Sequence, residues 1–400
     1  MHKKLIILAL ALILALALII SGCTDSDEAT TTTDDNATTT SGESIKVGAN
    51  FELSGPVATY GADSLRGFKM AIDEVNAAGG VLGGRQIEVI EKDNKSDAAE
   101  ATAAAEVLMT QNNVVLSVGP ATSGNFRAVI PVAMENRIPV ISSSATADDD
   151  ITVDTNGNVR DFVFRTCFTD SFQGKIMANY ASDALDAKTA VIFADNASDY
   201  AKGLATNFRA QFEENGGTVV DEQAYVAGDK DFNAVLTSLK GKDFDVIFVP
   251  GYYQEAGLII KQARELGINQ PILGADGFDS PELAEIAGAS NVNDVFFSNH
   301  YSELDESAEV QDFIEMFKDA NNGEQPNAFI AMGYDLGKYV VDAIERARSD
   351  DPAEIAAALS ATEKFTGVTG SFSVGDDHNV IKSAVVIKLE NGEQVAAERF

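Results

Sequence analysis

Polar groups that could bind a small molecule occur in five short segments of this sequence, each directly after a short apolar run. The segments are residues 54–61 (SGPVATYG), 119–124 (GPATSG), 142–146 (SSSAT), 251–253 (GYY) and 274–277 (GADG). Hydroxyl, main-chain and carboxylate groups there can donate or accept hydrogen bonds. In folds built on parallel sheets, ligands bind beyond the carboxyl ends of the strands. The spacing therefore predicts a binding cleft made by these segments.

Sequence signatures of catalysis are missing. There is no phosphate-binding P-loop, no Gly-x-Ser-x-Gly turn and no Gly-x-Gly-x-x-Gly opening a helix. Cys167 has no histidine near it in the sequence, so it is interpreted as a small core residue rather than a nucleophile. His2, His300 and His378 do not have metal-ligand spacing with cysteine. We expect a protein that catalyses nothing and uses no cofactor and no metal.

The elements that must position these segments alternate between strand and helix. Apolar runs predict strands, and apolar residues at helical spacing predict helices between them. The predicted strands are residues 45–51, 86–90, 114–118, 138–142, 189–193, 218–225 and 245–250, and the predicted helices include 65–75, 98–110, 203–215 and 255–266. Such alternation is typical of parallel sheets covered by helices on both faces.

The alternation runs twice, and the length is too great for one hydrophobic core. We therefore expect an α/β protein with two doubly wound parallel-sheet lobes joined by a hinge. The hinge is expected near Thr169, at residues 298–301 and at residues 369–372. This gives discontinuous lobes, 44–168 with 301–370 and 169–300 with 371–400.

The N-terminus predicts export. Lys3 and Lys4 precede an apolar run over residues 5–20, which ends in Ser-Gly-Cys at Cys23. The sequence before Cys23 resembles the lipobox of prokaryotic lipoproteins, so residues 1–22 are expected to be a signal peptide and Cys23 to carry a lipid. The alternative is an uncleaved membrane anchor, although the run is shorter than the roughly 20 residues of a spanning helix. Either reading places the rest of the chain outside the cytoplasm.

Residues 23–43 are rich in Thr and Asp and contain almost nothing that could pack, which predicts a flexible tether between membrane and lobes. Asn36 lies in a glycosylation sequon, a weak signal without a known host. The formal net charge is −33. An acidic surface of this kind argues against nucleic acid or anionic lipid as partners.

Several motifs, in this order, resemble the Leu/Ile/Val-binding family of type I periplasmic binding proteins, the solute-binding components of ABC importers. They lie at residues 54–61 (SGPVATYG), 76–80 (NAAGG), 231–232 (DF), 251–257 (GYYQEAG) and 262–264 (QAR). The resemblance covers residues 45–392. It implies a binding protein, expected to be a monomer, that captures an amino acid and delivers it to an ABC permease.

The resemblance also implies the roles of individual residues. Ser123 and the Thr146 main-chain N–H would hold the ligand's α-carboxylate, at a helix start where the dipole favours an anion. The Ser144 carbonyl, the Thr146 hydroxyl and Asp276 would accept from the α-ammonium. Tyr60, Tyr200 and Tyr252 match family aromatics that close over the ligand. Each also has a plainer interpretation: serines and Asp276 as turn residues, and tyrosines as packing residues.

Departures from the family pattern concern the side chain of the ligand. The leucine binders have a glutamate where this chain has Asp276, and an aromatic residue after a proline where it has Asn327. An amide there would tolerate a polar ligand side chain. The family's disulfide in the first lobe has no counterpart. Branched-chain or other small apolar amino acids remain the favoured ligands.

Two other functions share these features. A ligand-binding sensory protein could use the same fold, but no further membrane segment follows the lobes in this sequence. An extracellular hydrolase would need a nucleophile beside a base, and the sequence offers none. The favoured interpretation is a lipid-anchored binding protein on the outer face of the cytoplasmic membrane.

Overall fold

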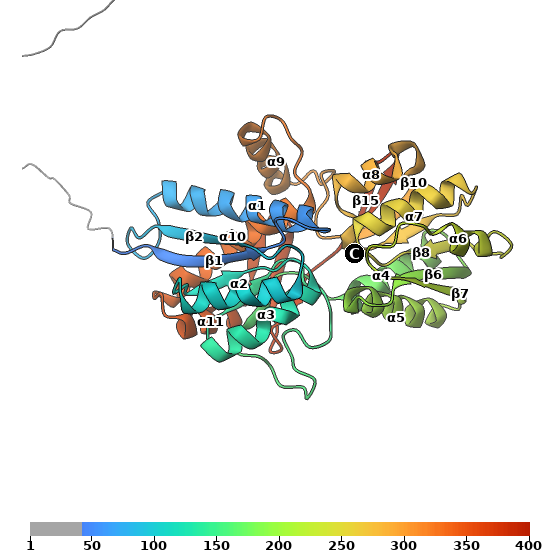
Figure 1. Cartoon of the computed structure of the whole chain (residues 1–400). Coiled ribbons are helices and arrows are strands. Elements are labelled where there is room, and N and C mark those ends of the chain that lie inside the picture. Colours follow the sequence, from blue (N-terminus) through green and yellow to red (C-terminus); the bar gives the residue numbers. More distant parts are fainter. Residues whose placement is uncertain (1–41) are drawn as a thin grey trace, which may run out of the picture. The chain divides into compact units, whose positions relative to one another are not determined.

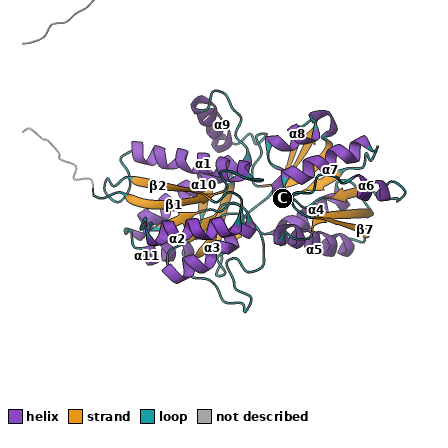
Figure 2. Ribbon diagram, in the orientation of Figure 1, coloured by secondary structure: helices purple, strands orange, loops and turns teal. Residues whose placement is uncertain are grey.

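Two separate parallel sheets organise the part of the chain that the structure, a computed structural model, describes, residues 42–400 (Figures 1 and 2). The predicted signal peptide, Cys23 and nearly all of the tether lie outside these residues. The first sheet has the order β2-β1-β3-β4-β5, with all neighbours parallel. Its strands are Ile45–Phe51 (β1), Ile87–Asp93 (β2), Leu116–Val118 (β3), Val140–Ser142 (β4) and Val163–Arg165 (β5).

The second sheet has the order β15-β14-β10-β9-β8-β6-β7. Five strands are parallel, whereas the C-terminal hairpin of β14 and β15 joins antiparallel to β10. Its strands are Thr189–Asp195 (β6), Thr218–Tyr225 (β7), Val246–Phe248 (β8), Ile272–Gly274 (β9), Asn293–Asn299 (β10), Val385–Glu390 (β14) and Glu393–Arg399 (β15). The predicted α/β class with two parallel-sheet lobes is confirmed. The antiparallel hairpin was not predicted.

Helices cover both faces of each sheet. In Figure 1, α1 and α2 lie on opposite sides of β1 and β2, and α7 and α5 lie on opposite sides of β6 and β8. The α-helices are Ala58–Ala77 (α1), Ala98–Thr110 (α2), Ser123–Asn136 (α3), Asp170–Asp183 (α4), Asp199–Glu214 (α5), Asn233–Leu239 (α6), Tyr253–Glu265 (α7), Pro281–Ala287 (α8), Ala308–Ala320 (α9), Ala328–Ala347 (α10) and Pro352–Ser360 (α11); two 3₁₀ turns are Asp276–Phe278 (η1) and Ala289–Asn291 (η2).

Local sequence explains where these elements begin. The strands β3, β4, β8 and β9 are buried along their whole length, which is why they are short continuous apolar runs. Asp97 caps α2, because its side chain accepts hydrogen bonds from the N–H groups of Ala99 and Glu100. Asn327 caps α10 in the same way through the N–H of Ile330.

The two longest helices, α1 and α10, approach each other closely because glycines lie at their contact. A Cβ atom at Gly67 would lie 1.9 Å from the carbonyl oxygen of Ile330, and one at Gly333 would lie 2.0 Å from that of Ser64. A Cβ at Gly337 would lie 2.6 Å from the Cβ of Ala71. Real Cβ atoms do not come so near, so the helix spacing requires glycine at these positions.

A small third sheet, β11-β12-β13, follows the helices of the C-terminal half. Its strands are Phe365–Gly367, Gly370–Val374 and Val380–Ile381. The turn before β13 is bound to the first sheet, since His378 Nδ1 lies 3.1 Å from the carbonyl oxygens of both Arg160 and Val163. Within residues 42–400, no helix has both the length and the apolar character needed to cross a membrane.

Candidate functional site

The loops after β3 and β4 form one side of a cleft between the two sheets. Ser123 is the first residue of α3, so its N–H has no partner within the helix. Its hydroxyl oxygen accepts a hydrogen bond from the N–H of Ala147, at 3.1 Å, which leaves the hydroxyl hydrogen free to donate elsewhere. The Ser144 hydroxyl donates to the carbonyl of Ala121, at 2.9 Å. The groups that this side turns toward the cleft are uncharged, and those of Ser123 can donate hydrogen bonds.

Glu52, which follows β1, holds this side in shape. Its side chain is completely buried, and its carboxylate accepts from the N–H groups of Ala121 and Thr122, at 3.0 and 3.2 Å. It also accepts from the Thr122 hydroxyl and the Asn125 side-chain amide, both at 2.8 Å. A buried carboxylate needs such donors, because an unpaired charge is costly away from water.

Asp276 forms the opposite side, at the start of η1 directly after β9. It is buried, with 3% of its surface exposed, and Oδ1 accepts from the Tyr200 hydroxyl at 2.7 Å and from Nε2 of Gln173 at 3.2 Å. Oδ2 lies 3.6 Å from Nε2 of His300. One carboxylate oxygen is therefore held by the protein, and the other has no donor within hydrogen-bond distance among the described residues.

Tyr60, on α1, connects the two sides. Its hydroxyl donates to the carbonyl of Gly277, at 2.5 Å, and accepts from the N–H of Tyr253, at 3.1 Å. Its ring stacks on Phe329, with centroids 4.4 Å apart, and meets Tyr252 edge-on at 5.5 Å. These bonds join elements of both sheets, so the cleft is closed in this structure.

The two sides and the aromatic rings enclose a small cavity with about 230 Å³ of space between atoms. The space inside the closed cleft is far smaller than in sites for drug-sized ligands, which favours a small solute. The cavity is lined by Tyr60, Ala121, Thr122, Ser123, Ser144, Tyr200, Tyr252, Asp276, Gly277 and Phe329. The structure thus brings together six of the seven residues singled out from the sequence.

Thr146, the seventh, lies beside the cavity without lining it. It is completely buried, and its carbonyl accepts from the N–H of Asp170, at 2.9 Å. Its hydroxyl has no hydrogen-bond partner within residues 42–400. A buried hydroxyl without a partner is unusual, so Thr146 keeps hydrogen-bonding capacity next to the cavity.

The expected role of Asn327 is wrong. Its amide does not line the cavity, because the side chain caps α10 and donates to Asp63 Oδ2 at 2.6 Å. The aromatic wall is supplied two residues later by Phe329. The cavity is therefore more apolar at this wall than the amide implied. The available signal was the aromatic residue at the second position of α10, two residues after Asn327.

Burial keeps the tyrosine hydroxyls of the cavity uncharged. It raises the pKa values of Tyr60, Tyr200 and Tyr252 well above the ordinary value, with the charge of Asp276 adding to the effect for all three. Burial also raises the pKa of Asp170, behind the cavity. Gln173 connects the two carboxylates, because its Nε2 donates to Asp170 Oδ1 at 3.0 Å as well as to Asp276.

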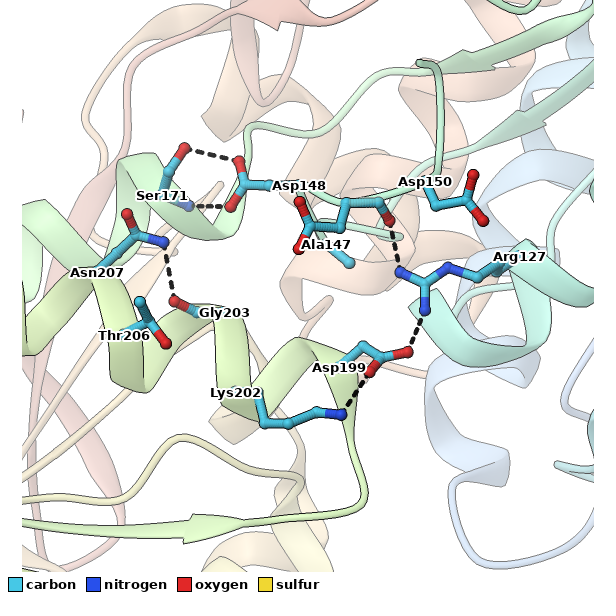
Figure 3. A pocket seen from close by; sticks show the side chains of 11 residues that line it. Arg127, Ala147, Asp148, Asp150, Ser171, Asp199, Lys202, Gly203, Thr206 and Asn207 are labelled. Atoms are coloured by element: carbon cyan, nitrogen blue, oxygen red, sulfur yellow. Dashed lines mark hydrogen bonds and ion pairs between the residues drawn. The ribbon is translucent and has the colours of Figure 1, made fainter. Parts of the chain in front are cut away.

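A larger hollow, with about 1,220 Å³ of space between atoms, opens between α3, α5 and residues 147–150 (Figure 3). Most of its charged groups already have partners. Arg127 pairs with Asp199 and Lys202 with the same carboxylate, at 2.6 Å for the lysine, while Asp148 accepts from the hydroxyl and N–H of Ser171. The smaller cavity is the better candidate site, since its polar groups still have capacity to bind.

The described residues contain no group of three or more His, Cys, Asp or Glu side chains placed to hold a metal ion. Glu52 and Oδ1 of Asp276 accept hydrogen bonds from donors of the protein.

Comparisons with known proteins agree with this geometry. A family model described as "Periplasmic binding protein" matches residues 44–394. The chain is 45% identical to the crystal structure of LivJ from Streptococcus pneumoniae, a branched-chain amino acid transporter substrate-binding protein in complex with isoleucine. That match covers 89% of this chain and 99% of LivJ, with a TM-score of 0.84.

Two further relatives show the range of similar proteins. The Leu/Ile/Val-binding protein BraC3 of Rhizobium johnstonii is 32% identical over 356 residues, covering 88% of this chain and 94% of BraC3. A solute-binding protein from R. palustris in complex with benzoate is 25% identical, covering 88% of this chain and 95% of that one, with a TM-score of 0.78. The chain belongs to the periplasmic binding protein family, the extracytoplasmic solute-binding components of ABC transporters.

Proposed function

We propose that this protein captures an α-amino acid with a small apolar side chain, a branched-chain amino acid above all, and delivers it to an ABC permease. The observation that carries the proposal is that hydrogen-bond donors and a carboxylate lie on opposite sides of one small cavity. The N-terminus of α3 with Ser123 offers donors on one side, and Asp276 offers a carboxylate on the other. A zwitterion satisfies both sides at once, leaving no buried charge unpaired.

The roles of the lining residues follow from this arrangement. Ser123 donates to the ligand's carboxylate, assisted by the positive end of the α3 dipole. Asp276 Oδ2 pairs with the ammonium, and the unpartnered hydroxyl of Thr146 and the carbonyl of Ser144 supply further acceptors. Tyr60, Tyr200, Tyr252 and Phe329 surround the side chain, and their rings favour an apolar one.

The relatives support an amino acid over an aromatic acid. LivJ, the most similar of the relatives described above, is in complex with isoleucine. Benzoate, the ligand of the R. palustris protein, has a carboxylate but no ammonium. With benzoate in this cavity, Asp276 would be a buried carboxylate without a cationic partner, which is unfavourable.

We place the hinge in the three segments that connect the sheets, with delivery coupled to opening and closing of the lobes. The first two connections follow β5 and β10, near Thr169 and residues 298–301. The third is placed between β13 and β14, later in the chain than residues 369–372, because His378 binds main-chain groups of the first sheet. With this shift from the lobes expected from the sequence, the proposed lobes are 44–168 with 301–381 and 169–300 with 385–400.

Thermal unfolding and titration calorimetry with isoleucine, leucine, valine and benzoate test the proposal. A ligand that binds only the folded protein stabilises it by about 2.7 kcal/mol at a hundred times its Kd. We expect a clear rise in Tm with at least one branched-chain amino acid and none with benzoate. A rise with benzoate alone would show that the ammonium site has been assigned wrongly.

We further propose that Cys23 carries a lipid that anchors a monomer to the outer face of the cytoplasmic membrane. The support is the sequence Ile20-Ser21-Gly22-Cys23 after an apolar run. We expect Cys23→Ser to give a protein that is released or keeps its signal peptide. Mass spectrometry of the membrane fraction checks this, and an intact Met1 with an unmodified Cys23 in the unaltered protein would contradict it.

A further inference from the structure

His300 lies directly behind the carboxylate of Asp276 and has an unusual environment. It follows the last residue of β10, and its side chain is fully buried, as is 96% of the side chain of Asp276. Its Nε2 is 3.6 Å from Asp276 Oδ2, the oxygen that the protein does not otherwise hold. Neither ring nitrogen has a hydrogen-bond partner within residues 42–400. Buried polar atoms normally have one, so this ring has capacity left for the site.

His378 provides an internal comparison, because it is also buried and also stacks on a phenylalanine. Its ring lies 4.3 Å from that of Phe164, and both nitrogens have partners, including Ser360 Oγ at 3.1 Å from Nε2. Burial of a histidine in this fold therefore does not require unpaired nitrogens. The difference at His300 is its position beside Asp276.

The orientation of the His300 ring is fixed. It stacks on Phe168 with centroids 3.6 Å apart and planes inclined by 12°. On the other side of the carboxylate, Tyr200 and Gln173 hold Oδ1. Asp276 is thus held at one oxygen by two donors, and a ring of fixed direction faces the other oxygen, next to the cavity.

We propose that His300 is a positioning residue for the ligand's ammonium. In the ligand-bound site the neutral ring closes the remaining gap from 3.6 Å, donates from Nε2–H to one lone pair of Asp276 Oδ2, and keeps the other lone pair directed at the ammonium. The inference rests on the proposed function, because it requires Asp276 to be the ammonium partner. The His300 ring also fixes the position of Asp276 Oδ2. This compensates for an aspartate side chain that is one methylene shorter than the glutamate of the leucine binders.

Proton binding at His300 opposes ligand binding in this arrangement. An imidazolium and an ammonium would share one carboxylate, and the positive charge of Lys382, between β13 and β14, further disfavours a charged ring. Burial lowers the pKa of His300 to about 4 in the closed cleft, from an ordinary value of about 6.5. Closure therefore disfavours the charged ring, so affinity is full above about pH 6.5 and declines as the pH falls toward 4.

Protonation of Asp170 and Asp279 affects closure of the cleft in the sense opposite to protonation of His300. Burial raises the pKa values of both carboxyls in the closed cleft, so both favour closure as the pH falls. The pH dependence of the unaltered protein is a sum of these effects. The contribution of His300 is the difference between the unaltered protein and a variant that changes this ring alone.

Titration calorimetry with isoleucine and its des-amino analogue, 3-methylpentanoate, tests the inference on the full-length protein. H300F keeps the stack on Phe168 but removes both nitrogens, and H300Q keeps an N–H donor that does not titrate. At pH 7.5 we expect H300F to weaken isoleucine about tenfold and the analogue less than twofold. H300Q should bind isoleucine within about threefold of the unaltered protein and lose less affinity between pH 7.5 and 5.0.

H378F is the matched control, since it removes the nitrogens of a buried, stacked histidine away from the cavity. It should leave the affinity ratio of the two ligands unchanged even where it lowers Tm. Equal weakening of both ligands in H300F, or an unchanged pH dependence in H300Q, would overturn the inference. If D276N binds isoleucine as well as the unaltered protein does, the proposed function fails instead, and this inference with it.

Discussion

A buried carboxylate from each side of the cleft can be compared, and the two differ in what surrounds them. Glu52, on the side of the first sheet, accepts four hydrogen bonds from residues 121–125. Asp276, on the side of the second sheet, has donors at Oδ1 only. Both are at most 3% exposed. The donors of the protein satisfy Glu52 completely and leave Asp276 half satisfied.

This difference separates a structural carboxylate from one that can bind a ligand. Glu52 stabilises the loop that opens α3 and has no capacity left for a solute. Asp276 keeps one oxygen beside the cavity, held in place through its neighbours. Burial and charge are alike at the two positions, so the number of protein donors distinguishes them.

The largest effect is expected for Asp276→Asn. Breaking a buried charge pair by neutralising one partner costs about 3–5 kcal/mol, which is about two to three and a half decades in affinity. Isoleucine should weaken by this amount in titration calorimetry. Its des-amino analogue should bind the variant no worse than the unaltered protein, because the repulsion of its carboxylate by Asp276 is relieved. Equal weakening of both ligands would mean that Asp276 only shapes its turn.

Glu52→Gln should act mainly on stability. Glutamine has nearly the same size, but it loses the charge-assisted hydrogen bonds and turns an N–H₂ group toward donors. We expect a loss of about 1.5–3 kcal/mol in the free energy of unfolding, measured by urea denaturation without ligand. A variant that kept its stability but lost isoleucine as severely as D276N would break the distinction between the two carboxylates.

Tyr60→Phe tests the connection between the two sides. It removes the hydrogen bonds to the carbonyl of Gly277 and from the N–H of Tyr253 while keeping the stack on Phe329. We expect affinity to fall by about 1–2 kcal/mol, or about five- to thirtyfold. Small-angle X-ray scattering should show a larger fraction of open protein at subsaturating isoleucine, and an unchanged open fraction would contradict a role in closure.

Asp279→Asn should have the smallest effect and an opposite sign. Asp279 accepts from the N–H of Ala328 across the cleft, at 2.7 Å, and burial raises its pKa to about 6. The charged form therefore opposes closure above pH 6, whereas the protonated form does not. Asparagine can still accept from Ala328, so isoleucine should bind about two- to fivefold more tightly at pH 7.5. At pH 5 the gain should vanish, and calorimetry at both values checks it.

Much of the cleft could be predicted because parallel strands place their carboxyl ends at one edge. Ser123, Ser144 and Asp276 each follow a strand that the sequence marks as a short apolar run, and the strand order does not affect that conclusion. The bounds of α2 and β7 were predicted without error because Asp97 caps one and a turn with Gly216 and Gly217 precedes the other.

The polar network behind the cavity could not be predicted. Gln173 lies on α4, Asp276 on η1 and Ser298 on β10, and the hydrogen bonds that unite them depend on tertiary distances. No local pattern shows that Glu52 turns inward while Asp276 faces the cavity. Asn327 was misjudged for a related reason, since the start of α10 assigns it to the helix cap and gives the wall to Phe329.

The glycine contact between α1 and α10 has a consequence for how ligand preference can evolve. Tyr60 and Phe329 stand on these two helices, so Gly67, Gly333 and Gly337 set the distance between two walls of the cavity. An alanine at any of them would force the helices apart and widen the gap between those rings. Selection for a bulkier solute can therefore act on the glycine contact between α1 and α10, although this contact lies away from the solute. In a library screened for new ligands, the three glycines belong with the cavity walls as positions to randomise.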